Sequence, residues 1–471
     1  MEDYEEGVQW KKYNEYKITV DPYQDDKATE IKLCSFARPH MRAFHMAWIG
    51  FHMAFFIWFS ASPLLSEIRE DLGLTKKQIW STSVIAVGGT ILFRFIMGPV
   101  CDKVGPRIPF ACVLMFCSIP TGLTGLANSF NSLLFIRLLI GIAGCTFVMC
   151  QYWTSRMFTK NVVGTANAMV GGWGNLGGGV TQLVVGSLLF PLFKIFYDGD
   201  SEKAWRTVCV VPAVITFLVA LLILWITEDA PKGNYGDMKR HGVMPDISAA
   251  ASFRSGALNL NTWILFFQYA CCFGVELTMQ NAAALYFTDE FGQSTESSAA
   301  IASIFGWMNL FARAMGGFSS DWANRKMGMK GRILVHTICL FGEGALVVVF
   351  ANTQSLVGSI CIMICFAICG QAAAGTSFAI VPYVDPTATG SIAGLVGGGG
   401  NCGAVAFGMA FRELSYKEAF TIMGFCIIGS AVLSVFIKIK GCSSLLLGGV
   451  DDRPAKKDST LSVPEPQKDA A

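Results

Sequence analysis

The chain has 471 residues, of which 53% are hydrophobic and 15% charged, and its formal net charge is +2. Ordinary soluble domains carry about 25% charged residues, so a single aqueous core would not bury this much apolar surface. The small net charge gives no indication of nucleic-acid binding. The 16 cysteines lie mostly in apolar runs, without the spacing of a disulfide framework or a metal site. The composition predicts a membrane protein with many spans and without metal or cofactor.

In chain order, the sequence begins with a polar segment, 1–42, which we expect to be a cytoplasmic tail. Two apolar halves follow, 43–227 and 262–438, joined by a polar cytoplasmic linker at 228–261. Residues 439–471 are rich in Pro, Lys and Asp and are expected to form a disordered cytoplasmic tail. A membrane helix needs roughly 20 apolar residues. The stretches that meet this requirement are about 43–65, 79–100, 108–127, 132–153, 163–190, 206–227, 262–287, 297–319, 331–351, 355–378, 389–411 and 419–438.

Basic residues predict the orientation of these spans. With both ends in the cytoplasm, the inner loops carry twelve Lys and Arg residues and the outer loops carry seven. Cytoplasmic loops of membrane proteins have such an excess of positive charge. We therefore expect both termini to be cytoplasmic.

The two halves repeat the same special residues. Residues 93–107 read FRFIMGPVCDKVGPR and residues 312–326 read ARAMGGFSSDWANRK; in both, an arginine precedes an aspartate by eight positions. The glycine runs GGWGNLGGG and GGGGNCG also repeat, with an offset of 226 between their asparagines. Matched halves are typical of transporters that hold the substrate between the halves near the middle of the membrane.

Arg94 and Arg313 lie near the middle of the second and eighth spans. An arginine there costs about 2.5 to 3.5 kcal/mol on insertion scales, and its guanidinium does not escape this cost by losing a proton. Two equivalent guanidiniums that face each other would offer planar forks of donors to a small oxyanion such as nitrate, nitrite, bicarbonate or a carboxylate. The alternative is that each arginine caps a carbonyl or pairs with a carboxylate, for which Glu276 and Glu343 are the candidates.

The two glycine runs are expected to be closely packed helices, because small residues let membrane helices approach one another. A phosphate-binding loop would require a preceding strand and usually a lysine, and the sequence shows neither there. We expect Asn175 and Asn401 to contact the anion directly or through one neighbour; an interhelical hydrogen bond is the alternative. The glycines of these two helices are Gly171, Gly172, Gly174, Gly178, Gly397, Gly398 and Gly400.

The segment GPVCDKVGPR, 98–107, resembles the loop signature of the major facilitator superfamily, and GFSSDWANRK, 317–326, is a weaker copy of it. A carboxylate at a helix end beside basic loop residues can form a cytoplasmic latch that breaks when the halves rock; a solvated turn is the alternative. Arg137 resembles the superfamily's arginine in the fourth span, with a role in gating or coupling or a structural bond to a neighbouring helix. The gating candidates are Asp102, Arg107, Asp321 and Arg325.

Further motifs resemble one family within this superfamily. GGWGNLGGGV and GLVGGGGNCGAVAFG resemble the paired nitrate signatures of the nitrate/nitrite porter family, and residues 268–287 resemble span seven of its eukaryotic high-affinity branch. The resemblance covers essentially all the spans and implies an all-α major facilitator fold, with twelve transmembrane helices in two pseudo-symmetric six-helix halves. It implies that nitrate is gripped by Arg94 and Arg313 between aromatic walls formed by Phe147, Tyr269 and Phe273.

The resemblance also implies import of nitrate, with nitrite as a second substrate, at the plasma membrane; a vacuolar membrane is the alternative. Anion uptake against a negative-inside potential costs about 2.3 kcal/mol per charge per 100 mV, so we expect proton symport. Glu276 is the first proton-carrying candidate, beside Arg137; a permanent structural pairing of Glu276 with an arginine is the alternative.

Two other functions stay open: a nitrate/nitrite exchanger, and a nitrate-binding sensor without net flux. An enzyme is not expected, because the sequence shows no nucleophile–base pair, metal cluster or nucleotide motif. The expected partners are nitrate, protons and the lipid bilayer. Plant relatives often require a small single-span accessory protein, which makes such a protein a candidate partner, and the chain itself is expected to transport as a monomer.

Overall fold

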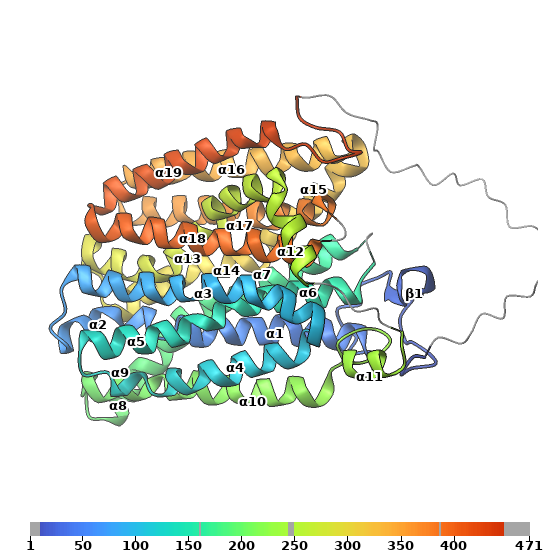
Figure 1. The fold of residues 1–471 in the computed structure, drawn as a ribbon. Coiled ribbons are helices and arrows are strands. Elements are labelled where there is room, and N and C mark those ends of the chain that lie inside the picture. Colours follow the sequence, from blue (N-terminus) through green and yellow to red (C-terminus); the bar gives the residue numbers. More distant parts are fainter. Residues whose placement is uncertain (1–9, 160–161, 244–248, 386–387, 447–471) are drawn as a thin grey trace, which may run out of the picture.

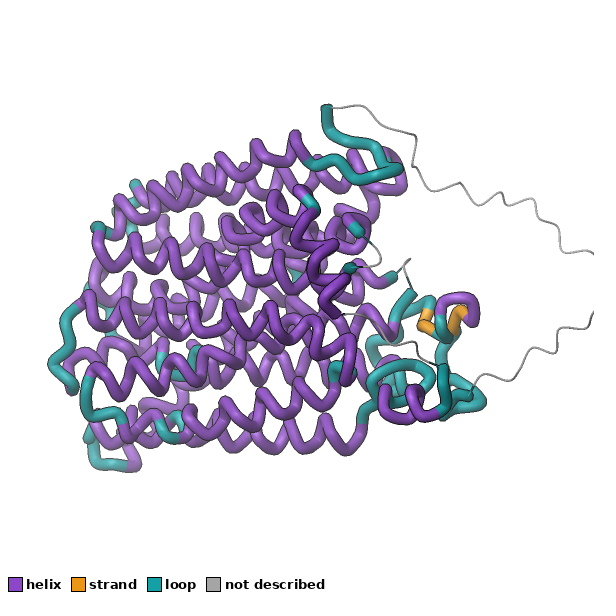
Figure 2. The backbone as a smooth tube through the Cα atoms, in the orientation of Figure 1, coloured by secondary structure: helices purple, strands orange, loops and turns teal. Residues whose placement is uncertain are grey.

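The computed structural model describes residues 10–159, 162–243, 249–385 and 388–446. The parts of the two expected tails at 1–9 and 447–471, and residues 244–248 of the expected linker, lie outside the described residues. The described chain is almost entirely helical, and its long helices run side by side along one direction (Figure 1, Figure 2).

The first half lies on the lower side of Figure 1. Its helices are α1 (His40–Trp58), α2 (Leu65–Asp71), α3 (Lys76–Val104), α4 (Arg107–Gly122), α5 (Phe130–Gly141), α6 (Thr146–Met157), α7 (Val163–Thr181), α8 (Phe190–Phe196), α9 (Ser201–Val208) and α10 (Val210–Ile226). A 3-10 turn, Ile142–Cys145, joins α5 to α6, and a π-helical segment, Gln182–Leu189, joins α7 to α8.

The second half lies above it. Its helices are α13 (Leu260–Phe291), α14 (Thr295–Trp307), α15 (Ala312–Met327), α16 (Met329–Ala351), α17 (Leu356–Val384), α18 (Thr389–Glu413) and α19 (Tyr416–Val432). Between the halves lie two shorter helices, α11 (Tyr235–Arg240) and α12 (Ala249–Leu258). The strands β1 (Val20–Asp21) and β2 (Lys27–Ala28) pair antiparallel before α1.

Eleven helical segments within the described residues are long and apolar enough to cross a membrane. The expected eighth span corresponds to α14 and α15, which are joined by the 3-10 turn Met308–Leu310. It is less apolar than the others because α15 carries four charged residues. With this span the two halves contain six crossings each, so the predicted architecture is confirmed.

Helix α10 illustrates how the outer surface suits lipid. Val214, Leu218 and Leu222 recur every four residues and are 52%, 58% and 39% exposed, whereas Thr216 and Ala220 are fully buried. An apolar stripe of this kind would be unfavourable in water but favourable against acyl chains. Helix α10 therefore turns its small and polar residues to the interior of the bundle and its large apolar residues outward.

The two glycine helices occupy equivalent places in the halves. A Cβ atom at Gly174 of α7 would overlap Phe51 of α1, and one at Gly400 of α18 would overlap Phe273 of α13. The two glycines are therefore needed for close helix contact, because no side chain would fit. On their other sides α7 lies against α14 and α15 and α18 lies against α3, so both glycine helices are at the interface between the halves.

The segment that precedes α1 is docked on the segment that follows α10, at one end of the bundle (Figure 1). Tyr13 donates a hydrogen bond to Glu228, and Lys12 forms an ion pair with the same carboxylate at 3.2 Å. The ring of Trp10 stacks on His241, with 4.3 Å between centroids. Burial and the hydrogen bond to Glu228 raise the pKa of Tyr13 to about 12, so its hydroxyl remains a donor at neutral pH.

Candidate functional site

Arg94 of α3 is fully buried and hydrogen-bonded to two backbone carbonyls from different halves. Its Nε and Nη2 donate to the carbonyl of Gly144 at 3.1 and 2.9 Å, and its Nη1 donates to the carbonyl of Gly397. Gly144 lies in the 3-10 turn that interrupts the fourth span. Among the described residues no carboxylate pairs with Arg94. Its positive charge is therefore solvated by carbonyl dipoles and not neutralised.

Arg313 of α15 is 2% exposed and has a different set of partners. Its Nη2 donates to the hydroxyl of Tyr269 at 2.8 Å. Its Nη1 lies 3.7 Å from a carboxylate oxygen of Glu276 and has no hydrogen-bond partner in the described part of the protein. Both partners belong to α13. Arg313 thus keeps one free donor in a buried position.

The two arginines meet on the same pair of aromatic rings. Phe147 of α6 and Phe273 of α13 are stacked, with 5.8 Å between centroids. The guanidinium carbon of Arg94 lies 5.0 and 5.2 Å from these centroids, and that of Arg313 lies 5.9 and 5.7 Å from them. All four distances are within the range of cation–π contact. The repeat-related arginines are therefore brought together at the interface of the halves.

Two further rings complete the aromatic group. Tyr269 stacks near Phe273 at 5.1 Å, and Phe378 of α17 lies edge-on to both Phe147 and Tyr269, at 5.0 and 5.1 Å. Phe378 was not expected from the sequence, in which nothing distinguishes it among 36 phenylalanines. The rings make the surroundings of both guanidiniums apolar, and such surroundings strengthen electrostatic interactions.

Glu276 is held by two amide side chains. Asn175 of α7 donates to its Oε2 at 3.3 Å, and Asn309 donates to its Oε1 at 2.7 Å. Asn175 is therefore linked to Arg313 through Glu276. Asn309 was missed in the sequence, although it precedes Arg313 by only four positions in the expected eighth span.

Each glycine helix lies against the arginine of the opposite half. A Cβ at Gly171 of α7 would lie 3.2 Å from Nε of Arg313, and one at Gly397 of α18 would lie 3.5 Å from Nη1 of Arg94. Asn401, one turn after Gly397, donates to the carbonyl of Val87 at 3.0 Å. Its amide therefore joins α18 to α3, and within the described part of the chain it forms no hydrogen bond with either guanidinium.

Other glycines of the two runs also face close neighbours. A Cβ atom at Gly172 would contact Asn309, one at Gly178 would contact Gln280, and one at Gly398 would contact Phe95.

Arg137 does not belong to the arginine pair. It is 2% exposed and donates from Nη2 to the side-chain oxygen of Asn281 at 3.0 Å. The same oxygen accepts a hydrogen bond from Ser62 at 3.2 Å. Arg137 and Ser62 come from the first half and Asn281 from the second, so this group joins the halves away from the aromatic rings.

The gating candidates lie at the end of the bundle where the N-terminal segment is docked. Asp321 pairs with Arg332 at 2.7 Å and accepts a hydrogen bond from Thr165, at the start of α7, at 3.2 Å. A Cβ at Gly390, at the start of α18, would lie 3.5 Å from the carboxylate of Asp102. Each aspartate thus faces the beginning of the opposite glycine helix.

The two gating arginines lie near the same end of the bundle, but among the described residues neither forms an ion pair with Asp102 or Asp321. Arg107 donates to the carbonyl of Leu224 at 2.8 Å, and Arg325 is exposed.

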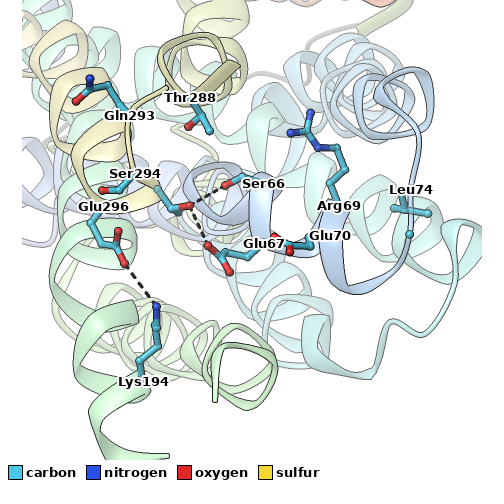
Figure 3. A pocket seen from close by; sticks show the side chains of 12 residues that line it. Ser66, Glu67, Arg69, Glu70, Leu74, Lys194, Thr288, Gln293, Ser294 and Glu296 are labelled. Carbon is cyan, nitrogen blue, oxygen red and sulfur yellow. Dashed lines mark hydrogen bonds and ion pairs between the residues drawn. The ribbon is translucent and has the colours of Figure 1, made fainter. Parts of the chain in front are cut away.

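A polar pocket of about 640 Å³ lies at the other end of the bundle (Figure 3). Its walls come from α2 and α8 of the first half and from the end of α13, the following turn and the start of α14 in the second. Thr295 donates to Glu67 at 2.9 Å and lies 3.0 Å from the hydroxyl of Ser66. Arg69 pairs with Asp289 at 3.1 Å beside it. The halves are therefore joined at both ends, with the arginines between them.

Comparison with known proteins agrees with this architecture. Residues 47–409 match the Major Facilitator Superfamily. The chain is 37% identical to High-affinity nitrate transporter 2.3 of Oryza sativa subsp. japonica, over 92% of this chain and 84% of that protein. It is 38% identical to Nitrate transporter 2.1 of Chlamydomonas reinhardtii, over 91% of this chain and 80% of that protein.

Two solved structures share the fold. One is a bacterial homolog of the human lysosomal transporter Spinster, inward-facing and occupied, with a TM-score of 0.59 and 16% identity over 84% of this chain and 94% of that chain. The other is the human organic anion transporter MFSD10, with a TM-score of 0.57 and 13% identity over 84% of this chain and 99% of that chain. The predicted fold and family are confirmed. The protein is a multi-pass membrane transporter, not an enzyme, of the major facilitator superfamily, and within it belongs to the nitrate/nitrite porter family, on the branch of the eukaryotic high-affinity nitrate transporters.

Proposed function

We propose that this protein imports nitrate by proton symport, with Arg94 and Arg313 holding the anion between the two halves. The observation that carries the proposal is the convergence of these two repeat-related arginines on one pair of phenylalanine rings. The names of the relatives support nitrate as the substrate, and the cyanobacterial relatives named nitrate/nitrite transporters support nitrite as a second one.

The charges favour a small monovalent anion. Two guanidiniums and one carboxylate, Glu276, leave one net positive charge when the carboxylate is ionised. A nitrate ion balances that charge, and its flat shape matches both the guanidinium fork and the face of an aromatic ring. Such an anion can use the free Nη1 of Arg313, which has no hydrogen-bond partner within the described residues.

The position of Glu276 supports proton coupling. Its carboxylate is the anion that neutralises Arg313 in the absence of substrate, at 3.7 Å. Protonation removes this negative charge and leaves Arg313 to the nitrate ion, so proton binding and nitrate binding favour each other. Arg137 is not required in this account, because its partner is Asn281.

Alternating access then requires that contacts at the two ends of the bundle break in turn. At one end these are the contacts of Asp321 with Thr165 and of Asp102 with the start of α18. At the other end they are the contacts around Thr295. We propose that the protein lies in the plasma membrane and that the end with Asp102 and Asp321 faces the cytoplasm. Both termini are then on the cytoplasmic side.

The test uses the purified full chain in proteoliposomes, with labelled nitrate outside and a pH-sensitive dye inside. We expect an inward proton gradient to drive nitrate uptake, and nitrate to drive acidification of the lumen. Uptake that requires nitrite inside the vesicles and causes no acidification would instead identify an exchanger. Nitrate binding without flux under either condition would identify a sensor.

A further inference from the structure

A second buried carboxyl group lies in the half that carries Arg313. Glu343 of α16 is 1% exposed, and its Oε2 is buried without a hydrogen-bond partner. No hydrogen bond or ion pair reaches its carboxyl from any residue that the structure describes. The group lies against Gly370 of α17, where a Cβ atom would approach its Oε1 to 2.6 Å. The glycine therefore leaves the space that the carboxyl occupies.

Among the described residues, none of the groups that face Glu343 supplies a positive charge. The titratable neighbours are Cys271, Cys272 and Glu276 on α13, Cys339 on α16 and Cys369 on α17. Helix α19 faces this turn of α16 with Gly424 and Ile428. An ionised carboxylate without a cation in such a place is strongly unfavourable, and an acidic residue inside a membrane span points to a functional site. The carboxyl is therefore protonated in this arrangement of the helices.

The first half carries no carboxyl at the position that corresponds to Glu343 in the sequence repeat. The position equivalent to Glu343 by the offset of 226 is Cys117 of α4, and the position equivalent to Gly370 is Gly144. Cys117 is fully buried and donates to the carbonyl of Leu139 of α5 at 3.6 Å. The first half thus packs the same helix pair with a small thiol. The carboxyl of the second half requires another explanation.

We propose that Glu343 is a second proton-binding group of the transport cycle, beside Glu276. This inference rests on the proton symport proposed above. Each carboxylate takes up one proton while the site faces the outside and releases it while the site faces the cytoplasm. Glu276 is the charged group that acts electrostatically on Glu343, so the state of one carboxyl affects the other. Two protons with one nitrate carry one net positive charge, which a negative-inside potential drives inward.

The test measures the charge moved per nitrate ion, from current and labelled uptake in the same voltage-clamped cells. For the wild type we expect about one positive charge inward per nitrate, and for Glu343→Gln about zero, with uptake retained. Glu343→Asp, which keeps a carboxyl, should keep the wild-type ratio. An unchanged ratio in Glu343→Gln, or a wild-type ratio of about zero, overturns this inference and leaves the proposed symport intact.

Failure of the proposed symport gives a different charge ratio for the wild type. Nitrate then moves alone, and one negative charge enters with each nitrate ion. If Glu343→Gln does not reach the membrane, Glu343→Cys is measured in the same way. It places at 343 the residue type that position 117 already accommodates. A ratio near zero in this variant supports the inference, and a wild-type ratio overturns it.

Discussion

Arg313 and Glu276 form an ion pair inside the bundle, with 3.7 Å between Nη1 and Oε2. This distance is too long for a hydrogen bond. The carboxylate instead receives its hydrogen bonds from Asn175 and Asn309. Charge alone therefore joins the pair, and Arg313 can exchange this partner for another anion while Glu276 keeps both amide donors.

The first prediction concerns Glu276→Gln. Glutamine retains an acceptor for one amide but removes the charge that competes with nitrate for Arg313. We expect the wild type to bind nitrate about tenfold more tightly when Glu276 is protonated than when it is ionised. The affinity of the variant should be tight and should depend much less on pH than that of the wild type. Calorimetric titration with nitrate, in acidic and alkaline buffers, measures these affinities for the solubilised wild type and variant.

Glu290→Gln is the matched control, because Glu290 lies on the same helix but is exposed. It should keep the pH dependence of the wild type. If Glu276→Gln kept that dependence as well, the proton that favours nitrate binding would lie on another group.

The second prediction concerns Arg313→Lys. Lysine preserves the positive charge but loses the planar fork that reaches Tyr269 with one nitrogen and leaves another free. Loss of a charged hydrogen bond at a buried site costs about 1.5 to 3 kcal/mol, which corresponds to about 10- to 100-fold in affinity. We expect nitrate uptake to require correspondingly higher concentrations. Arg254→Lys, at an exposed position of α12, is the control and should transport as the wild type does.

Surface labelling of both variants separates this effect from poor expression. Arg313→Lys with wild-type affinity would remove Arg313 from the substrate site.

The long helices could be predicted well because their apolar character is continuous. The predicted span 262–287 became α13, Leu260–Phe291, and the predicted span 389–411 became α18, Thr389–Glu413. The interruptions at Ile142–Cys145, Gln182–Leu189 and Met308–Leu310 were not predicted. Pro191 follows the second interruption by two residues and has no N–H to donate to the preceding turn, which is a local cause. The other two occur in apolar runs without proline, so their cause lies in packing between helices.

Only part of the candidate site could be predicted, because only some of its residues stand out in the sequence. Charged residues in apolar spans are rare, so Arg94 and Arg313 could be recognised one by one and matched through the repeat. Phe378 has no such signal, and its place beside Phe147 depends on contacts between distant helices. The docking of Tyr13 on Glu228 joins residues 215 positions apart in polar segments, where no periodicity indicates a contact.

The third prediction concerns close packing at the glycine helices. In Gly400→Ala the new methyl group would overlap the ring of Phe273, which is one of the two rings beneath both guanidiniums. Overpacking of this kind costs about 1 to 3 kcal/mol and should displace the ring. We expect a lower melting temperature and a loss of nitrate uptake. Gly429→Ala in α19 is the control, because nothing lies within 4 Å of its Cβ position.

Selective loss of uptake in Gly400→Ala would link the glycine to the site. Equal behaviour of the two variants would show that the ring tolerates displacement.

The last prediction concerns the docked N-terminal segment, which we expect to loosen in alkali. Burial and the hydrogen bond to Glu228 raise the pKa of Tyr13 to about 12, from about 10 in an unfolded chain. A raised pKa means that docking favours the protonated hydroxyl. Its contribution is complete below about pH 10 and is lost as the pH rises towards about 12. Proteolysis at the exposed Lys17 should therefore accelerate across this range in the wild type.

Tyr13→Phe should be cleaved faster than the wild type already at neutral pH, because the donor to Glu228 is absent, and should show less of the alkaline acceleration. Tyr23→Phe is the matched control, since Tyr23 is 99% exposed, and it should be cleaved as the wild type is. Because Glu228, which accepts the hydrogen bond of Tyr13, follows the last span of the first half directly and lies outside the candidate site, nitrate affinity should be the same in the three proteins. A change of affinity in Tyr13→Phe alone would show that the docked segment acts on the site between the halves.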